Sequence, residues 1–206
     1  MPTAEREKAA RILHQQGQRL IDAKNFKEAE AKLRLSVRYV DYYINILYTL
    51  SNLLYDQKNY KDSIKFLEKS LKIDSENEFA KLLIGANYLQ IKDYEKGEKV
   101  FKSVLEKAPK SYEANYNLGL IYNDLKNYKS AVNHFEKALE AKPEDVETNY
   151  QYGLALYKTG KKDEAQTAYE VLFYLNEIKA EKLRKIIGAA PIKNEQIDKV
   201  KTITTK

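Results

Sequence analysis

The pattern that decides the fold lies in residues 112–145, which read YEANYNLGLIYNDLKNYKSAVNHFEKALEAKPED. The same pattern recurs 34 residues away on either side, so one small-residue position repeats along the chain. The residues at this position are Gly17, Ser51, Gly85, Gly119 and Gly153. Four of the chain's seven glycines therefore share one register. An internal period of this length predicts a stack of similar units.

With Gly119 as the eighth residue of a unit, the register defines five units: 10–43, 44–77, 78–111, 112–145 and 146–179. Each unit reads as two helices of about a dozen residues joined by a short turn. Residues 1–9 are expected to extend the first helix. The turns read Lys24-Asn25-Phe26, Lys58-Asn59-Tyr60, Lys92-Asp93-Tyr94, Lys126-Asn127-Tyr128 and Gly160-Lys161-Lys162. In the first four, the Asn or Asp is predicted to cap the second helix.

Small residues recur in pairs twelve positions apart, one on each helix of a unit: Gly17/Ala29, Ser51/Ser63, Gly85/Gly97, Gly119/Ala131 and Gly153/Ala165. Such pairs let the two helix backbones approach closely. Large residues are expected to fill the space between hairpins: Leu20, Leu54, Tyr88, Tyr122 and Leu156 on first helices, and Leu33, Leu67, Phe101, Phe135 and Tyr169 on second helices. Because one hairpin alone cannot bury this face, neighbouring hairpins must stack on one another.

These residues resemble the tetratricopeptide repeat family over residues 10–179. The motif in the fourth unit consists of Tyr116, Leu118, Gly119, Tyr122, Tyr128, Ala131, Phe135, Ala138 and Pro143. The resemblance implies an all-α, right-handed solenoid of five helix-turn-helix repeats. Asp41, Ser75 and Glu177 replace the terminal proline of the motif in units 1, 2 and 5, which weakens the expected loop geometry there.

The C-terminal region should close the stack. Residues 180–190 are predicted to form a capping helix that covers the last hairpin with Leu183, Ile186 and Ile187, and to end at Gly188 and Pro191. Residues 191–206 are expected to form a flexible basic tail. Eight Lys/Arg against three acidic residues in 179–206 give this end +5 of the chain's net +6. The repeats are therefore nearly neutral, which argues against a nucleic-acid-binding stripe.

In proteins of this family, the second, fifth, ninth, twelfth and thirteenth residues of each unit line a concave partner-binding wall. The resemblance therefore implies these partner contacts: Asn45, Tyr48, Asn52, Tyr55, Asp56, Phe79, Leu82, Leu89, Gln90, Glu113, Tyr116, Asn123, Asp124, Tyr150 and Tyr157. The first unit adds Arg11, His14, Gln18, Ile21 and Asp22, and the remaining wall positions are Ala86, Leu120, Glu147, Leu154 and Lys158. Tyrosine suits such a surface because its ring is rigid and its hydroxyl forms hydrogen bonds. The alternative interpretation is that these tyrosines only pack between helices.

The expected partner is a peptide segment or helix with apolar anchors and some basic residues. Family members that grip a chaperone's C-terminal carboxylate use a clamp of Lys, Asn and Arg, of which only Asn52 is present here. Asp56 and Asp124 would also repel an acidic tail.

Catalytic signals are poor, and no enzyme activity, cofactor or metal is predicted. The chain has no cysteine, and its two histidines lack an adjacent nucleophile or a metal-ligand spacing. His134 is expected at the surface, away from the wall, and His14 is expected to be a partner contact.

The leading hypothesis is a non-enzymatic adaptor that binds another protein. One alternative is a scaffold that self-assembles through repeat ends or grooves. The basic tail is interpreted as a solubilising terminus, as a contact with an acidic partner or membrane surface, or as a segment that docks into a second copy's groove. A second alternative is a chaperone-like or regulatory subunit of a secretion or envelope assembly. A cytoplasmic location is expected because residues 1–10 lack the apolar core of a signal peptide.

Overall fold

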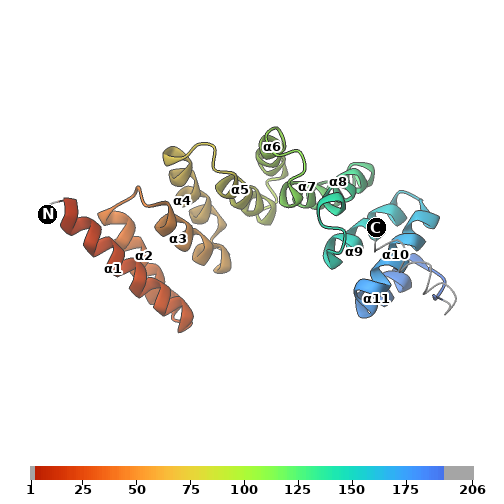
Figure 1. Ribbon diagram of the computed structural model, residues 1–206, viewed down its shortest axis with the longest axis horizontal. Helices are drawn as coiled ribbons and strands as arrows, with labels where there is room; N and C mark the ends of the chain where they lie inside the picture. Colours follow the sequence, from red (N-terminus) through yellow and green to blue (C-terminus); the bar gives the residue numbers. More distant parts are fainter. Residues whose placement is uncertain (1–2, 193–206) are drawn as a thin grey trace. The chain divides into compact units, whose positions relative to one another are not determined.

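The computed structural model describes residues 3–192, and this part of the chain contains only helices (Figure 1). In chain order they are α1 (Thr3–Asp22), α2 (Phe26–Tyr39), α3 (Ile44–Asp56), α4 (Tyr60–Ile73), α5 (Glu78–Gln90), α6 (Tyr94–Leu105), α7 (Tyr112–Asp124), α8 (Tyr128–Ala141), α9 (Val146–Lys158), α10 (Lys162–Leu175) and α11 (Glu177–Ile187). The prediction of an all-α chain of helical-hairpin repeats is confirmed. No described helix has both the length and the apolar character needed to cross a membrane.

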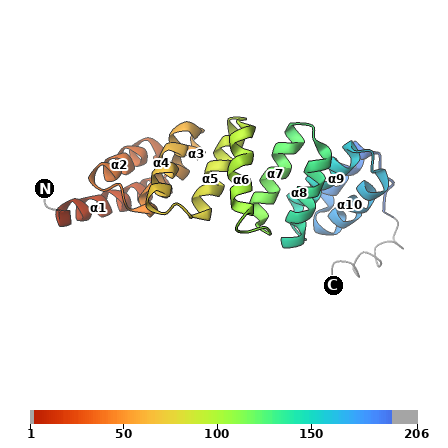
Figure 2. The same cartoon turned by 90° about the horizontal axis from the view of Figure 1, so that it is seen from above.

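The chain divides into two compact units, unit 1 (Met1–Val100) and unit 2 (Phe101–Lys206), which are described separately. In unit 1, α1 packs on α2 and α3 packs on α4, while α2 contacts α3 and α4 contacts α5 (Figure 2). In unit 2, the same order holds from α7 to α11, and α9 also contacts α11. Within each unit, therefore, hairpins stack on their neighbours in chain order.

All ten residues of the small-residue pairs are buried. At Gly119 on α7, an added Cβ would lie 2.5 Å from Cδ1 of Phe135 on α8. At Gly17 on α1, it would lie 2.7 Å from Cγ of Leu33 on α2. These glycines thus make room for a large side chain of the second helix in the same hairpin. Leu33 and Phe135 therefore also pack within their own hairpins, in addition to the packing expected between hairpins.

The large second-helix residues form the centre of the packing. Leu33, Leu67, Phe101, Phe135 and Tyr169 are all fully buried. On the first helices, Leu54 and Leu156 are buried, whereas Leu20, Tyr88 and Tyr122 are only partly so. The predicted core is therefore tightest along the second helices.

The hairpin turns share one backbone conformation. Lys24, Lys58, Lys92 and Lys126 have φ between 58° and 61°, and Gly160 takes the same place with φ 84°. In each turn, the N–H of the following residue donates to a carbonyl oxygen five residues earlier, as from Asn127 to Tyr122 at 2.8 Å. This is the Schellman arrangement, which ends a helix with one left-handed residue.

Side-chain caps form at three of the four predicted turns. Asn59, Asp93 and Asn127 each accept a hydrogen bond from a backbone N–H three residues later. Asn25 is the exception, because its side-chain amide donates to the Glu28 carboxylate at 2.8 Å and makes no cap. The prediction for Asn25 is therefore wrong.

The two proline-containing loops are held by a buried asparagine that the repeat motif does not include. The Asn149 amide donates to the carbonyl oxygens of Pro143 at 2.8 Å and Asp145 at 2.9 Å. Asn115 bonds Pro109 and Ser111 in the same way, at 3.2 and 3.0 Å. In unit 1 the equivalent positions hold Leu13, Leu47 and Lys81 instead of asparagine, and Leu47 is buried in the core.

Helix α11 covers α9 and α10, but with a different set of residues from the one predicted. It begins at Glu177, where the Asn176 side chain accepts from Lys179 N–H at 2.9 Å, and it ends at Gly188 in the left-handed conformation. Ala180 and Leu183 are buried and Ile187 packs on the same cluster. Ile186 is 47% exposed, so its expected covering role is wrong. Most of the predicted basic tail, residues 193–206, lies outside the described part.

Candidate functional site

None of the fifteen predicted partner contacts is buried. Seven are exposed: Asn45, Asn52, Asp56, Phe79, Gln90, Glu113 and Asp124. Eight are partly buried: Tyr48, Tyr55, Leu82, Leu89, Tyr116, Asn123, Tyr150 and Tyr157. They lie on first helices, which form two surfaces described separately: the unit 1 surface on α1, α3 and α5, and the unit 2 surface on α7 and α9. Their role in binding remains a prediction.

The unit 1 surface presents an aromatic pair at its α3–α5 edge. The rings of Tyr48 and Phe79 meet edge to face, with centroids 5.2 Å apart and an angle of 74°. Phe79 is 52% exposed, which is unusual for a phenylalanine. The Tyr48 hydroxyl donates to Asn77 Oδ1 at 2.6 Å, and the same oxygen accepts from Ala80 N–H at 3.1 Å at the start of α5. Tyr48 is therefore fixed in place, and its ring supports an exposed apolar side chain.

Burial raises the pKa of Tyr48 and of Tyr55, so both remain neutral hydrogen-bonding groups at physiological pH. Tyr55 meets Tyr60 edge to face at 5.3 Å between centroids. The alternative interpretation of the tyrosines is thus partly right, since each of these rings packs on another ring.

A hollow of about 410 Å³ lies between α1 and the start of α3. It is lined by Arg11, His14, Tyr42, Tyr43, Ile44, Asn45 and Ile46. His14 is partly buried there, and burial lowers the pKa of its imidazole. The Thr49 hydroxyl donates to the Asn45 carbonyl, so His14 Nε2 donates to Thr49 Oγ1, at 2.9 Å. His14 therefore holds α1 against α3.

On the unit 2 surface, aromatic rings are accompanied by paired charges. Tyr112 and Tyr116 stack with centroids 5.8 Å apart. The Lys142 ammonium lies 3.9 Å from the Tyr112 ring centroid and donates to Glu113 Oε1 at 2.9 Å. Burial raises the pKa of Tyr112 to about 12 and raises that of Tyr116. Burial opposes ionisation of Glu113, but the hydrogen bonds from Lys142 and from the backbone N–H of Glu113, together with the Lys142 charge, outweigh it, and the pKa of Glu113 is lowered.

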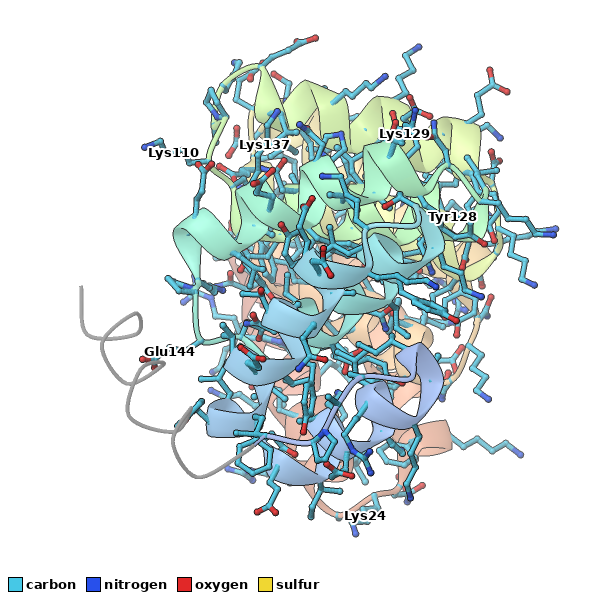
Figure 3. All side chains as sticks on the ribbon, turned by 90° about the vertical axis from the view of Figure 1, so that its right-hand side faces the viewer. Lys24, Lys110, Tyr128, Lys129, Lys137 and Glu144 are labelled. Carbon is cyan, nitrogen blue, oxygen red and sulfur yellow. The ribbon has the colours of Figure 1, made fainter. Side chains whose placement is uncertain are left out.

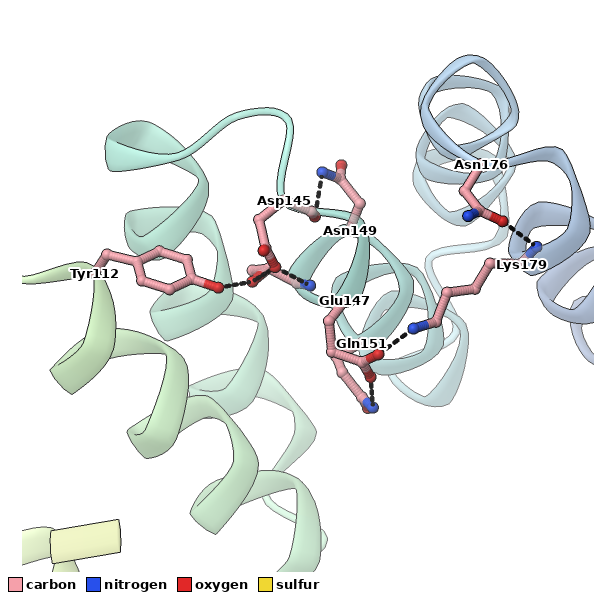
Figure 4. A network of polar contacts seen from close by, with 8 residues as sticks. Tyr112, Asp145, Glu147, Asn149, Gln151, Asn176 and Lys179 are labelled. Atoms are coloured by element: carbon pink, nitrogen blue, oxygen red, sulfur yellow. Dashed lines mark hydrogen bonds and ion pairs between the residues drawn. The ribbon is translucent and has the colours of Figure 1, made fainter. Parts of the chain in front are cut away.

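One repeat further on, α9 carries a second pair of this kind (Figure 4). Lys179 forms an ion pair with Glu147 and lies 5.4 Å from the Tyr150 ring centroid. Glu147 also accepts from Gln151 Nε2 at 2.8 Å. As at Glu113, burial acts to raise the pKa of Glu147. The hydrogen bonds from Lys179 and Gln151 outweigh burial, so the pKa of Glu147 is lowered.

A polar chain ties α7 to the start of α9 (Figure 4). Thr148 donates its hydroxyl to Asp145 Oδ1 at 2.6 Å, which leaves Thr148 Oγ1 to accept from the Tyr112 hydroxyl at 3.0 Å. Tyr112 is thus fixed by a hydrogen bond at its hydroxyl group and by the Tyr116 ring stacked on its face.

Tyr112, Lys142 and Lys179 were not among the predicted contacts. The sequence held only part of this signal, because Glu113 and Glu147 share the second position of their repeats, whereas Lys142 follows α8 and Lys179 lies on α11. The expectation that His134 is a surface side chain is wrong. His134 is partly buried, stacks on Tyr122 at 5.4 Å, and its Nδ1 lies 3.1 Å from Asn115 Oδ1.

Within residues 3–192, no group of three or more His, Asp or Glu side chains is placed to hold a metal ion. The side chains of the two surfaces therefore offer aromatic faces, amides and paired charges, which are suited to holding another polypeptide.

Models of the tetratricopeptide repeat match residues 44–77, 79–111, 112–145 and 147–174. No curated protein matches the chain in sequence. Among solved structures, MamA from Desulfovibrio magneticus RS-1 has a TM-score of 0.70 and 24% identity, over 84% of this chain and 96% of that one. PilF from Pseudomonas aeruginosa has a TM-score of 0.72 and 19% identity, over 89% and 86%. YrrB, described as a TPR protein with an unusual peptide-binding site, has a TM-score of 0.66 and 15% identity, over 84% and 90%. At these identities, the likeness shows the fold alone.

Proposed function

Because this chain belongs to the tetratricopeptide repeat family, whose members generally act as protein–protein interaction modules, we propose that it is a non-enzymatic adaptor. It binds a segment of a partner protein on its first-helix surfaces. The peptide-binding site named for YrrB supports a polypeptide as the ligand class.

The observation that carries this proposal is the exposed Phe79 supported by Tyr48. An exposed aromatic ring held by a fixed neighbour loses little side-chain entropy on binding, so it is a suitable anchor for a partner's apolar side chain. The neighbouring exposed amides of Asn45 and Asn52 can pair with the backbone of a bound segment.

The proposal can be tested by selecting binders from a displayed peptide library against the full chain and measuring their affinities by fluorescence anisotropy. Phe79→Ala should weaken a selected peptide by about 30-fold, the equivalent of ~2 kcal/mol for an interface anchor. Phe26→Ala is the matched control, since Phe26 is 44% exposed but lies at the start of the second helix α2.

Tyr116→Ala and Tyr150→Ala extend the test to the unit 2 surface. If the selected peptides bind all of these variants as well as the unmodified chain, or lose affinity equally for Phe26→Ala, the first-helix surfaces are not the binding site.

Self-association through a repeat end is the second candidate. Its support is the outer side of α11, where Ile178 is 81% exposed and Ile186 is 47% exposed. If this side joins two copies, light scattering should show a mass that rises with concentration, and Ile178→Glu with Ile186→Glu should abolish the rise. A constant monomer mass at all concentrations would exclude it.

A further inference from the structure

Two lysines on unit 2 reach equivalent glutamates one repeat apart. Lys142 directly follows α8 and Lys179 lies in the first turn of α11, and each reaches the glutamate at the second position of the preceding first helix, α7 or α9. Lys142 lies on Glu113 and the Tyr112 ring, and Lys179 lies on Glu147 and the Tyr150 ring. Each ammonium therefore has one carboxylate and one aromatic face as its surroundings.

A carboxylate beside an aromatic face is a favourable site for any ammonium or guanidinium group. Tyr112 is held rigidly, since its ring stacks on Tyr116 and its hydroxyl bonds Thr148. Glu147 is oriented by Gln151. Neither lysine takes part in these supporting contacts.

The ion pairs that hold Lys142 and Lys179 in these positions are weak. The side chains of Lys142 and Glu113 are both 51% exposed, and those of Lys179 and Glu147 are 29% and 41% exposed. Ion pairs exposed to this degree change an equilibrium constant by about fivefold or less. A cationic side chain from another molecule can therefore replace either lysine at little expense.

We propose that Glu113 with Tyr112, and Glu147 with Tyr150, form two binding sites, called seats below, for lysine or arginine side chains of a partner polypeptide. Lys142 and Lys179 occupy these two sites until the partner displaces them. This rests on the proposed function and specifies its partner class for unit 2: a segment with at least two basic side chains. Charge complementarity with the two glutamates selects this partner over an acidic one.

The test uses a fluorescein-labelled hexa-arginine peptide and the full chain at low salt, with hexa-glutamate as the opposite-charge probe. Lys142→Ala should tighten hexa-arginine binding about three- to tenfold, because the competitor is gone. The matched control is Lys137→Ala, which removes the same charge from an exposed position on α8, the helix that Lys142 follows (Figure 3). Glu113→Gln should weaken binding by a similar factor, while Glu144→Gln, an exposed loop residue, should not.

A double substitution separates displacement from general electrostatics. If Lys142 competes for the seat, Lys142→Ala should tighten binding only while Glu113 is present, and the gain should vanish in the Glu113→Gln background. Lys179→Ala and Glu147→Gln should repeat this result at the second seat.

The proposal is overturned if hexa-arginine does not bind, or if Lys142→Ala stays within twofold of Lys137→Ala. It is also overturned if hexa-glutamate binds as well as hexa-arginine. Phe79→Ala should leave hexa-arginine binding unchanged, so a failure of the seats would leave the anchor on unit 1, and the proposed function, separately testable.

Discussion

The two first-helix surfaces share one repeat register but differ in chemistry. At the second position of its repeats, unit 1 carries Arg11, Asn45 and Phe79, and unit 2 carries Glu113 and Glu147. Phe79 is exposed beside Tyr48, whereas the corresponding place in unit 2 holds an ion pair lying over a tyrosine ring. The same hairpin frame thus presents an exposed apolar side chain in one unit and ion pairs beside tyrosine rings in the other. This difference teaches that the buried positions of a repeat determine the frame and the exposed positions determine the chemistry of the surface.

If the frame is equivalent in both units, replacing a large, fully buried side chain by alanine should lower the stability of each unit by a similar amount. Phe135→Ala should lower the free energy of unfolding by ~3–5 kcal/mol, and Leu67→Ala by ~2–5 kcal/mol, because both side chains are fully buried. Denaturant unfolding followed by circular dichroism measures both, with exposed Phe26→Ala as the control. A loss below about 1 kcal/mol in either unit would break the equivalence.

The asparagine ties should distinguish the units. Asn149→Ala leaves the carbonyl oxygens of Pro143 and Asp145 without their amide donor, so unit 2 should lose ~1–3 kcal/mol of stability. Asn133→Ala, at an exposed site on α8, is the control. Equal stability of the two variants would show that the loop carbonyl groups are satisfied by water.

Among its described residues, unit 1 contains a buried polar atom without a hydrogen-bond partner, and replacing that side chain should raise the stability. Asn87 on α5 is buried and its Oδ1 has no hydrogen-bond partner, whereas the equivalent residues are Leu53 and Ile121. Asn87→Leu should therefore raise the free energy of unfolding by ~1 kcal/mol. Asn52→Leu, at an exposed site, provides the comparison. A lower stability of Asn87→Leu would mean that the site cannot hold the larger apolar shape.

Substitutions in the turns should change the free energy of unfolding least, and by the same amount in both units. Lys58→Gly and Lys126→Gly relieve a left-handed residue and should each stabilise by up to ~1 kcal/mol, while Gly160→Lys should destabilise by a similar amount. Thermal melts of the three variants test this. A difference in sign between Lys58→Gly and Lys126→Gly would show that the turns are not equivalent.

The sequence allowed the helical hairpins, the buried small-residue pairs and all five turn positions to be predicted, because each repeats with the same period. The features that could not be predicted depend on single contacts that do not repeat along the sequence. Asn25 looks like Asn59 but bonds Glu28 instead of the backbone. Ile186 sits beside Ile187, yet the stripe that packs runs through Ala180, Leu183 and Ile187. The contact of Lys142 was not predicted, since nothing in a local sequence pattern places an ammonium over a ring on another helix.

The turn lysines have a consequence for proteolysis. Lys24, Lys58, Lys92 and Lys126 are exposed, and each lies at the junction between the two helices of a hairpin. Trypsin cuts after lysine, so these four junctions carry cleavage sites at intervals of 34 residues, three of them Lys-Asn and the one at Lys92 Lys-Asp. Since a protease needs a locally opened backbone, the order in which fragments appear in a brief digestion would rank the hairpins by how readily each one opens.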